Sequence, residues 1–107
     1  MTTLNTDSGV VTLINTFTVA PDNVDDLLEV LSRATEQTMR HMPGFISASF
    51  HVADDRRHVA NYAQWRSKAD FEAMLNSPVA QKHMKEAAGI AKSAQPLIYS
   101  LCQTYEA

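Results

Sequence analysis

Four segments of the chain carry apolar side chains at the spacing of a β-strand. In the first of them, Val11, Leu13 and Phe17 are separated by even numbers of residues, so they share one face of an extended chain. β-branched residues, which strands favour, are also frequent there. The four predicted strands are Val10–Val19, Phe45–Ala53, His58–Arg66 and Leu97–Tyr105.

The stretch between the first two strands has the apolar spacing of a helix. From Val24 to Met42, apolar residues recur three or four positions apart, which places them on one side of a helix. Asp22 is the expected N-cap, because its carboxylate can accept hydrogen bonds from the free amides of the first turn. The helix is predicted to end near Pro43–Gly44, since proline and glycine commonly follow the end of a helix.

Two short helices are predicted before the last strand. Ser67 and Asp70 have the spacing of a capping box, and Ser77 precedes a proline that suits the first position of a helix. The predicted helices are Lys68–Asn76 and Pro78 to about Ala91, followed by a break at Ser93–Pro96.

The order of these elements, β-α-β-β-α-β, predicts an α+β subunit of the ferredoxin-like kind. In that arrangement the first and third strands lie side by side at the centre of an antiparallel sheet, and the helices cover one face. The second and fourth strands carry apolar residues on both faces, with Phe45 opposite Ile46 and Phe50. We therefore expect the uncovered face to pack against a second copy of the sheet, which gives a homodimer.

The composition describes one small globular domain. The chain has 107 residues, of which 45% are hydrophobic and 20% are charged. These values predict a single domain spanning residues 1–107, with its core at residues 10–105 after a polar leader at residues 1–9.

Charge and targeting signals exclude several classes of partner. Nine Lys and Arg residues against 12 Asp and Glu residues give a net charge of −3, which is a poor match for nucleic acid or an anionic membrane. The chain shows no membrane-length apolar run and no signal peptide. Its lone cysteine, Cys102, cannot form an intrachain disulfide. A cytoplasmic location is expected.

Two asparagines lie inside predicted strands, where this residue type is uncommon. Asn15 and Asn61 fall on the more apolar faces of the two central strands, and Trp65 shares the face of Asn61. A strand Asn can satisfy a nearby backbone group or pair with the other Asn, and a lone Trp is often core. Taken together, the three side chains predict a largely apolar cavity between sheet and helices that holds a flat ligand able to form hydrogen bonds.

The run Asn61–Trp65 (NYAQW), followed by Ser67 and Phe71, and the run Met42–Phe45 (MPGF) resemble the antibiotic biosynthesis monooxygenase family. The resemblance extends over about Val10 to Tyr105. It implies a ferredoxin-like subunit that dimerises through its sheets into an α+β barrel. NYAQW is similar in particular to small monooxygenases of aromatic polyketide pathways, which oxidise an anthrone-type ring to a quinone with O2 as co-substrate and without metal, flavin or haem.

The resemblance also implies roles for individual residues. In those enzymes the Asn and Trp of the third strand, and in some members an Asn of the first strand, line the substrate pocket, which implies catalytic roles for Asn61, Trp65 and Asn15. Phe71 occupies the position of a pocket tyrosine in some members, and Lys85 is the nearest match to an arginine on their last helix. The residues expected to bind a small aromatic substrate are Phe17, Phe71, Met74, His83 and Lys85.

The chemistry that the resemblance implies needs no cofactor. A dihydroxyanthrone that loses a proton from its central carbon gives an electron-rich enolate, which can pass an electron to O2. Amide and indole N–H groups in an apolar pocket can stabilise the anion. The sequence leaves the proton acceptor open among His51, Lys85 and water.

Two other functions remain as alternatives. Relatives that degrade haem carry an axial histidine near the position of His83 and a helix tryptophan where this chain has Met74, so His83 makes a haem-binding or haem-degrading protein the first alternative. A non-catalytic module that binds a small molecule is the second. No metal site is expected, because His51 and His58 do not combine with neighbouring carboxylates at a recognised ligand spacing.

Overall fold

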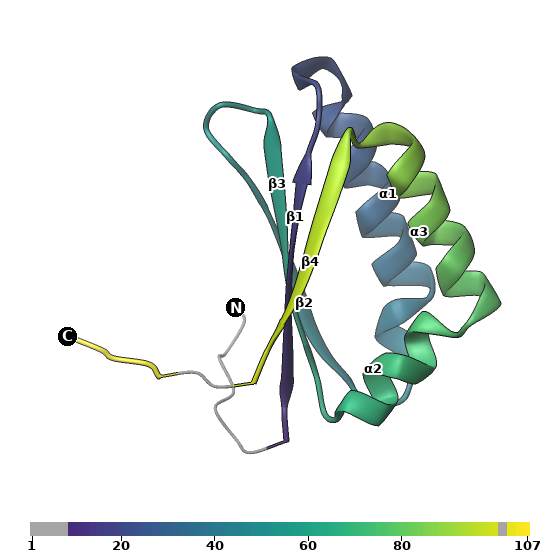
Figure 1. The fold of residues 1–107 in the computed structure, drawn as a ribbon, viewed down its shortest axis with the longest axis vertical. Helices are drawn as coiled ribbons and strands as arrows, with labels where there is room; N and C mark the ends of the chain where they lie inside the picture. The colour runs from purple at the N-terminus through teal and green to yellow at the C-terminus, as the bar shows by residue number, and fades with distance from the viewer. Residues whose placement is uncertain (1–8, 101–102) are drawn as a thin grey trace.

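The computed structural model describes residues 9–100 and 103–107, and within them the chain forms one antiparallel sheet covered on a single face by helices (Figure 1). The strand order is β2-β3-β1-β4, so the first and third strands lie at the centre, as the sequence predicted. The α+β, ferredoxin-like prediction is confirmed. The strands are β1 (Val11–Thr18), β2 (Phe45–Val52), β3 (His58–Trp65) and β4 (Ser93–Tyr99); the helices are α1 (Val24–Gln37), α2 (Lys68–Leu75) and α3 (Pro78–Ile90).

Both ends of α1 differ from the prediction. Asp22 is not its N-cap: it lies inside a 3-10 turn at Pro21–Asn23, and Asn23 precedes the helix without a side-chain cap. The helix ends at Gln37 and a second 3-10 turn, Met39–His41, follows. A 3-10 turn places residues three apart on one side, so the apolar spacing of this turn imitates a continuing α-helix.

The caps of the other two helices agree with the sequence. The hydroxyl oxygen of Ser67 accepts a hydrogen bond from the backbone N–H of Asp70 at 3.1 Å, and the hydroxyl donates to the Asp70 carboxylate at 3.0 Å. The Ser77 oxygen accepts from the Ala80 N–H at 3.4 Å, with Pro78 at the first helical position. Both serines therefore satisfy amides that the first turn leaves free.

The last strand begins earlier than predicted. β4 includes the segment Ser93–Pro96, where the sequence predicts a break, and it ends at Tyr99. Among the described residues β4 pairs with β1 alone, and Pro96 opposes Asn15. A proline is tolerated in an edge strand because its missing N–H can point away from the neighbouring strand. Residues 103–107 form no strand, and residues 101–102, within the predicted strand, lie outside the described residues.

A β-bulge in β2 changes which aromatic residues face the helices. Phe45 opposes Trp65 while Ser47 opposes Gln64, which leaves Ile46 as an extra residue in β2. The extra residue reverses the alternation, so Phe45 and Phe50 share the helix-covered face. The prediction that they point to opposite faces is wrong for this reason.

No helix among the residues 9–100 and 103–107 is long and apolar enough to cross a membrane.

The turn before β2 depends on Gly44. Its φ angle is +84°, and a Cβ atom at this position would overlap the side chain of Asp70, which accepts a hydrogen bond from Ser67, the N-cap of α2. The Gly44 carbonyl also accepts a hydrogen bond from the N–H of Arg66 at 2.7 Å, just after β3. The glycine thus allows the β2 entry, the β3 exit and the α2 cap to meet.

We predict that Gly44→Ala destabilises the fold by about 1–3 kcal/mol, because alanine is strained at this φ angle and its methyl group displaces Asp70. The matched control is Gly89→Ala in α3, where an added Cβ meets no atom within 4 Å. This control should stabilise the protein by up to about 1 kcal/mol through helix propensity. Urea unfolding of both variants measures the difference, and equal effects would contradict the role given to Gly44.

Candidate functional site

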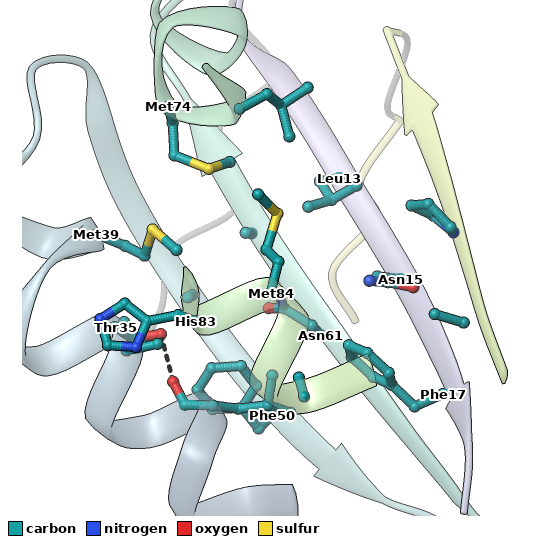
Figure 2. A pocket seen from close by; sticks show the side chains of 18 of the residues that line it. Leu13, Asn15, Phe17, Thr35, Met39, Phe50, Asn61, Met74, His83 and Met84 are labelled. Carbon is teal, nitrogen blue, oxygen red and sulfur yellow. Dashed lines mark hydrogen bonds between the residues drawn. The ribbon is translucent and has the colours of Figure 1, made fainter. Parts of the chain in front are cut away.

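The hydrophobic core is divided into two clusters with a cavity between them. One cluster contains Trp65, Phe71 and Met74 and lies toward α2. The other contains Leu27 and Val59 and lies under α1 and α3. The cavity between sheet and helices has a volume of about 300 Å³, and both clusters contribute to its wall (Figure 2).

Asn15 and Asn61 occupy the place where the two clusters separate. They are direct partners across the central β1–β3 pair. On β1, Asn15 lies between Leu13 of the first cluster and Phe17 of the second, as Figure 2 shows. On β3, Asn61 interrupts the apolar face in the same way. Two opposed amides thus replace the two apolar side chains that would have joined the clusters.

The cavity exists because many of the side chains that line it are small. Six alanines line it: β2, β3 and β4 contribute one each, α1 contributes one and α3 contributes two. Several other lining residues are exposed to solvent and belong to α2, α3 and β4, so the cavity opens between the helices and the edge of the sheet. The six alanines are Ala34, Ala48, Ala63, Ala87, Ala88 and Ala94; the exposed lining residues include Leu75, Met84 and Pro96.

The amide oxygens of the asparagine pair have no partner in the protein. Among the described residues, the buried side-chain atoms without a hydrogen bond are Oδ1 of Asn15, Oδ1 of Asn61 and Oγ of Ser47, and the first two belong to lining residues. An unsatisfied buried acceptor costs about 1–3 kcal/mol. The two amides therefore do not satisfy each other's oxygens, and both oxygens are available to a ligand that donates hydrogen bonds.

Trp65 forms a rigid wall of the cavity. Its side chain is 2% exposed. Phe45 meets the indole edge to face at 5.5 Å between ring centroids, and Phe71 meets it at 6.3 Å. Contacts of this kind fix the orientation of an aromatic ring. Phe71 therefore supports the indole of Trp65.

Most of the sequence-predicted site residues lie together. All three predicted catalytic residues line the cavity, as do four of the five predicted substrate-binding residues. Lys85 does not: it is exposed, and the lining residues of α3 are its neighbours along the helix. The lining residues from the prediction are Asn15, Asn61, Trp65, Phe17, Phe71, Met74 and His83.

Of the three predicted proton acceptors, His51 and Lys85 do not line the cavity. His51 is exposed and its register partner is Ala60, so it lies on the sheet face opposite the cavity. Lys85 lies outside the cavity as well. Water therefore remains, together with a residue that was expected only to bind substrate or haem, His83, whose ring lines the cavity.

His83 is held by Thr38, for which the sequence predicts no role in the site. Its Nε2 lies 3.1 Å from the hydroxyl oxygen of Thr38, which follows the last turn of α1. The two residues are 45 positions apart, and only the packing of α3 against α1 brings them together. Phe45 and Phe50 were also missed as cavity residues, because the bulge in β2 leaves no signal in the sequence.

The histidine of the β2–β3 hairpin belongs to a local hydrogen-bond network. The carboxylate of Asp55 accepts from the backbone N–H of Arg57 at 2.8 Å and lies 2.9 Å from Nδ1 of His58. The hydrogen bond from the Arg57 N–H is the main cause that lowers the pKa of the Asp55 carboxyl, and the bond to His58 lowers it further. Across residues 9–100 and 103–107, no three His, Cys, Asp or Glu side chains are grouped as metal ligands would be.

Comparison with known proteins agrees with this architecture. The antibiotic biosynthesis monooxygenase family model matches residues 10–86. The chain is 48% identical over 83 residues to tetracenomycin-F1 monooxygenase of Streptomyces glaucescens, which covers 78% of this chain and 74% of that protein.

Two solved structures share the fold at lower identity. SnoaB, a cofactor-independent oxygenase from Streptomyces nogalater, superposes with a TM-score of 0.77 at 23% identity, over 91% of this chain and 97% of that one. Rv0793 from Mycobacterium tuberculosis superposes with a TM-score of 0.78 at 16% identity, over 92% and 100% of the two chains.

These findings confirm the resemblance carried by the NYAQW and MPGF runs. The chain is an oxidoreductase of the monooxygenase class, and it belongs to the antibiotic biosynthesis monooxygenase family.

Proposed function

We propose that this protein is a cofactor-independent monooxygenase that uses O2 to oxidise a phenolic, anthrone-type aromatic substrate to a quinone. The observation that carries the proposal is the apolar cavity with two opposed amides whose oxygens lack partners. Such a site matches a flat aromatic ligand that carries hydroxyl groups on one edge.

The size and walls of the cavity suit a ligand of a few fused rings. A volume of about 300 Å³ is at the small end of ligand sites. Aromatic, methionine and alanine side chains form most of the wall, which favours an apolar ring system. The asparagine pair then fixes the orientation, because a phenolic O–H can donate to each free amide oxygen.

The same amides can follow the substrate as it ionises. A half-turn of the terminal amide group exchanges its oxygen for its NH2, so Asn15 and Asn61 can accept from a phenol and donate to an enolate oxygen. Donors held in an apolar site stabilise such an anion more strongly than water does. Transfer of an electron from the enolate to O2, formation of the C–O bond and loss of water give the quinone.

The relatives support this choice of reaction. The relative at 48% identity is named a tetracenomycin-F1 monooxygenase, and SnoaB is described as a cofactor-independent oxygenase. In the haem alternative, ligation through Nε2 of His83 would have to displace the contact with Thr38. A binding module without activity would use the same cavity, and turnover separates the two.

We also propose that the uncovered sheet face pairs with a second copy of the chain, as the sequence predicted. On this face Leu97 opposes Ile14 and Tyr99 opposes Thr12 across β1 and β4. The side chains of Leu97 and Tyr99 are exposed by 48% and 42%. If Leu97 and Tyr99 packed against the same two residues of a second copy, all four side chains would be removed from water.

Oxygen consumption tests the proposed reaction. Purified, metal-free protein mixed with dithranol, a dihydroxyanthrone, should accelerate O2 uptake and quinone formation over the spontaneous rate, and a chelator should not reduce the acceleration. Haem titration monitored at the Soret band runs in parallel. No acceleration, or activity only with bound haem, would contradict the proposal.

Substitution of the site residues should reduce turnover without unfolding the protein. Asn61→Ala and Trp65→Phe should each lower the rate at least about tenfold, because each removes an N–H group that can stabilise the anion. Far-UV circular dichroism should stay near that of the wild type. Loss of the fold in both variants, with unchanged turnover per folded molecule, would show that these residues serve the core.

The asparagine pair should also reduce stability. Replacing both Asn15 and Asn61 by leucine removes two unsatisfied acceptors and adds apolar volume to the cavity, so we predict a rise in Tm of about 4 °C or more. Dithranol oxidation should be lost in the same variant. A fall in Tm would indicate that the amides hold the fold together.

A further inference from the structure

We infer that His83 is the proton acceptor of the proposed oxidation and that Thr38 positions its ring. This assignment rests on the proposed function and adds a catalytic residue to it. The juxtaposition that carries it is an imidazole in the cavity wall whose Nε2 is 3.1 Å from the Thr38 hydroxyl.

His83 is the one ionisable side chain among the described residues that line the cavity. The remaining wall consists of aliphatic and aromatic residues, methionines, the two asparagines, a proline and Thr35. None of these can take a proton from carbon. The exposed ion pair of Arg33 with Glu86, at 2.8 Å, bridges α1 and α3 outside the cavity.

The Nε2–H tautomer of His83 gives the two ring nitrogens separate tasks. With the proton on Nε2, the N–H donates to the Thr38 oxygen and Nδ1 keeps its lone pair. When Nδ1 takes a proton, the Nε2–H bond to Thr38 remains unchanged. The hydroxyl can therefore hold the same ring orientation in the neutral and the protonated state.

The ring's partner is itself fixed by the end of a helix. The backbone N–H of Thr38 donates to the carbonyl of Ala34 at 3.0 Å, which places the residue at the C-cap of α1. The His83 ring is half-buried, so the site is shielded but not sealed from water. A histidine anchored in this way loses little freedom when it meets a substrate.

The oxidation balances in atoms, protons and electrons with only the anthrone, one O2 and the imidazole of His83. Nδ1 of His83 takes a proton from the CH2 group of the anthrone. The electron pair of the broken C–H bond stays on the anthrone, which becomes an enolate. The enolate reduces O2, and recombination forms a C–O bond to a peroxide anion. The imidazolium returns its proton to the peroxide. The ring then removes the second C–H proton, the O–O bond breaks to give the quinone and hydroxide, and the imidazolium protonates the hydroxide to one water.

Dithranol turnover by His83→Gln tests the assignment, because glutamine keeps a polar side chain but cannot act as the base. We expect kcat to fall about 100-fold, the scale of a lost general base. The isotope effect with dithranol deuterated at its CH2 group should rise, since C–H cleavage becomes slower. Added imidazole should restore part of the activity of His83→Ala.

The positioning role has its own readout. Thr38→Val removes the hydroxyl at nearly constant volume and should lower kcat with little change in KM, while Thr38→Ser should restore the rate. His41→Gln is the matched control, because His41 is an exposed histidine outside the cavity. Its turnover should equal that of the wild type.

Several results would overturn the assignment. One is that His83→Gln keeps the turnover and the isotope effect of the wild type. Another is that both His83 variants lose activity and imidazole does not rescue His83→Ala, which would indicate that His83 serves packing. An equal loss in His51→Gln would place the base on the other sheet face. If the wild-type protein itself fails to accelerate dithranol oxidation, the proposed function fails and this assignment with it; the other results leave the proposed function standing.

Discussion

The rest of the site depends on two amide groups that lie opposite each other inside the core of a small domain. Asn15 and Asn61 are paired across the central strands, and neither amide oxygen has a partner in the protein. Apolar residues at the same two positions would join the two core clusters into one. The pair instead keeps the clusters apart, and alanines around it keep the space open. The protein thus gives up stability at the point where it acquires a binding site, as functional sites commonly do.

The features that could be predicted from the sequence are those with a local physical signal. The alternation of β1 and β3 identified the face of each strand, so the convergence of the asparagines with Trp65 followed from the topology. Ser67 and Ser77 marked the helix starts because a capping hydroxyl has a fixed spacing to the amide it satisfies. The NYAQW run identified the family. The roles assigned to the site residues, the dimer, the single-domain boundaries and the cytoplasmic location stay predictions.

The features that could not be predicted depend on contacts between distant parts of the chain. The bulge at Ile46 shifts one strand by a single residue without any compositional mark, and it brings two phenylalanines into the cavity wall. Pro96 indicated a break, although an edge strand tolerates a proline whose missing N–H points away from the neighbouring strand. Thr38 at the end of α1 contacts His83 on α3, and the spacing of residues within either helix does not predict a contact between the two helices. Lys85 was selected by its resemblance to a family position, whereas the turn of α3 places it outside the cavity.

The most direct test of the central claim observes the asparagine amides themselves. We would record side-chain NH2 resonances of uniformly ¹⁵N-labelled protein during titration with a dihydroxyanthraquinone, which has the flat phenolic shape of the product and cannot be turned over. The account predicts saturable shifts of the Asn15 and Asn61 amides, assigned by substitution, while those of the exposed residues Asn23 and Asn76 stay in place. Unchanged resonances of the pair at saturating ligand, with shifts confined to other residues, would contradict it.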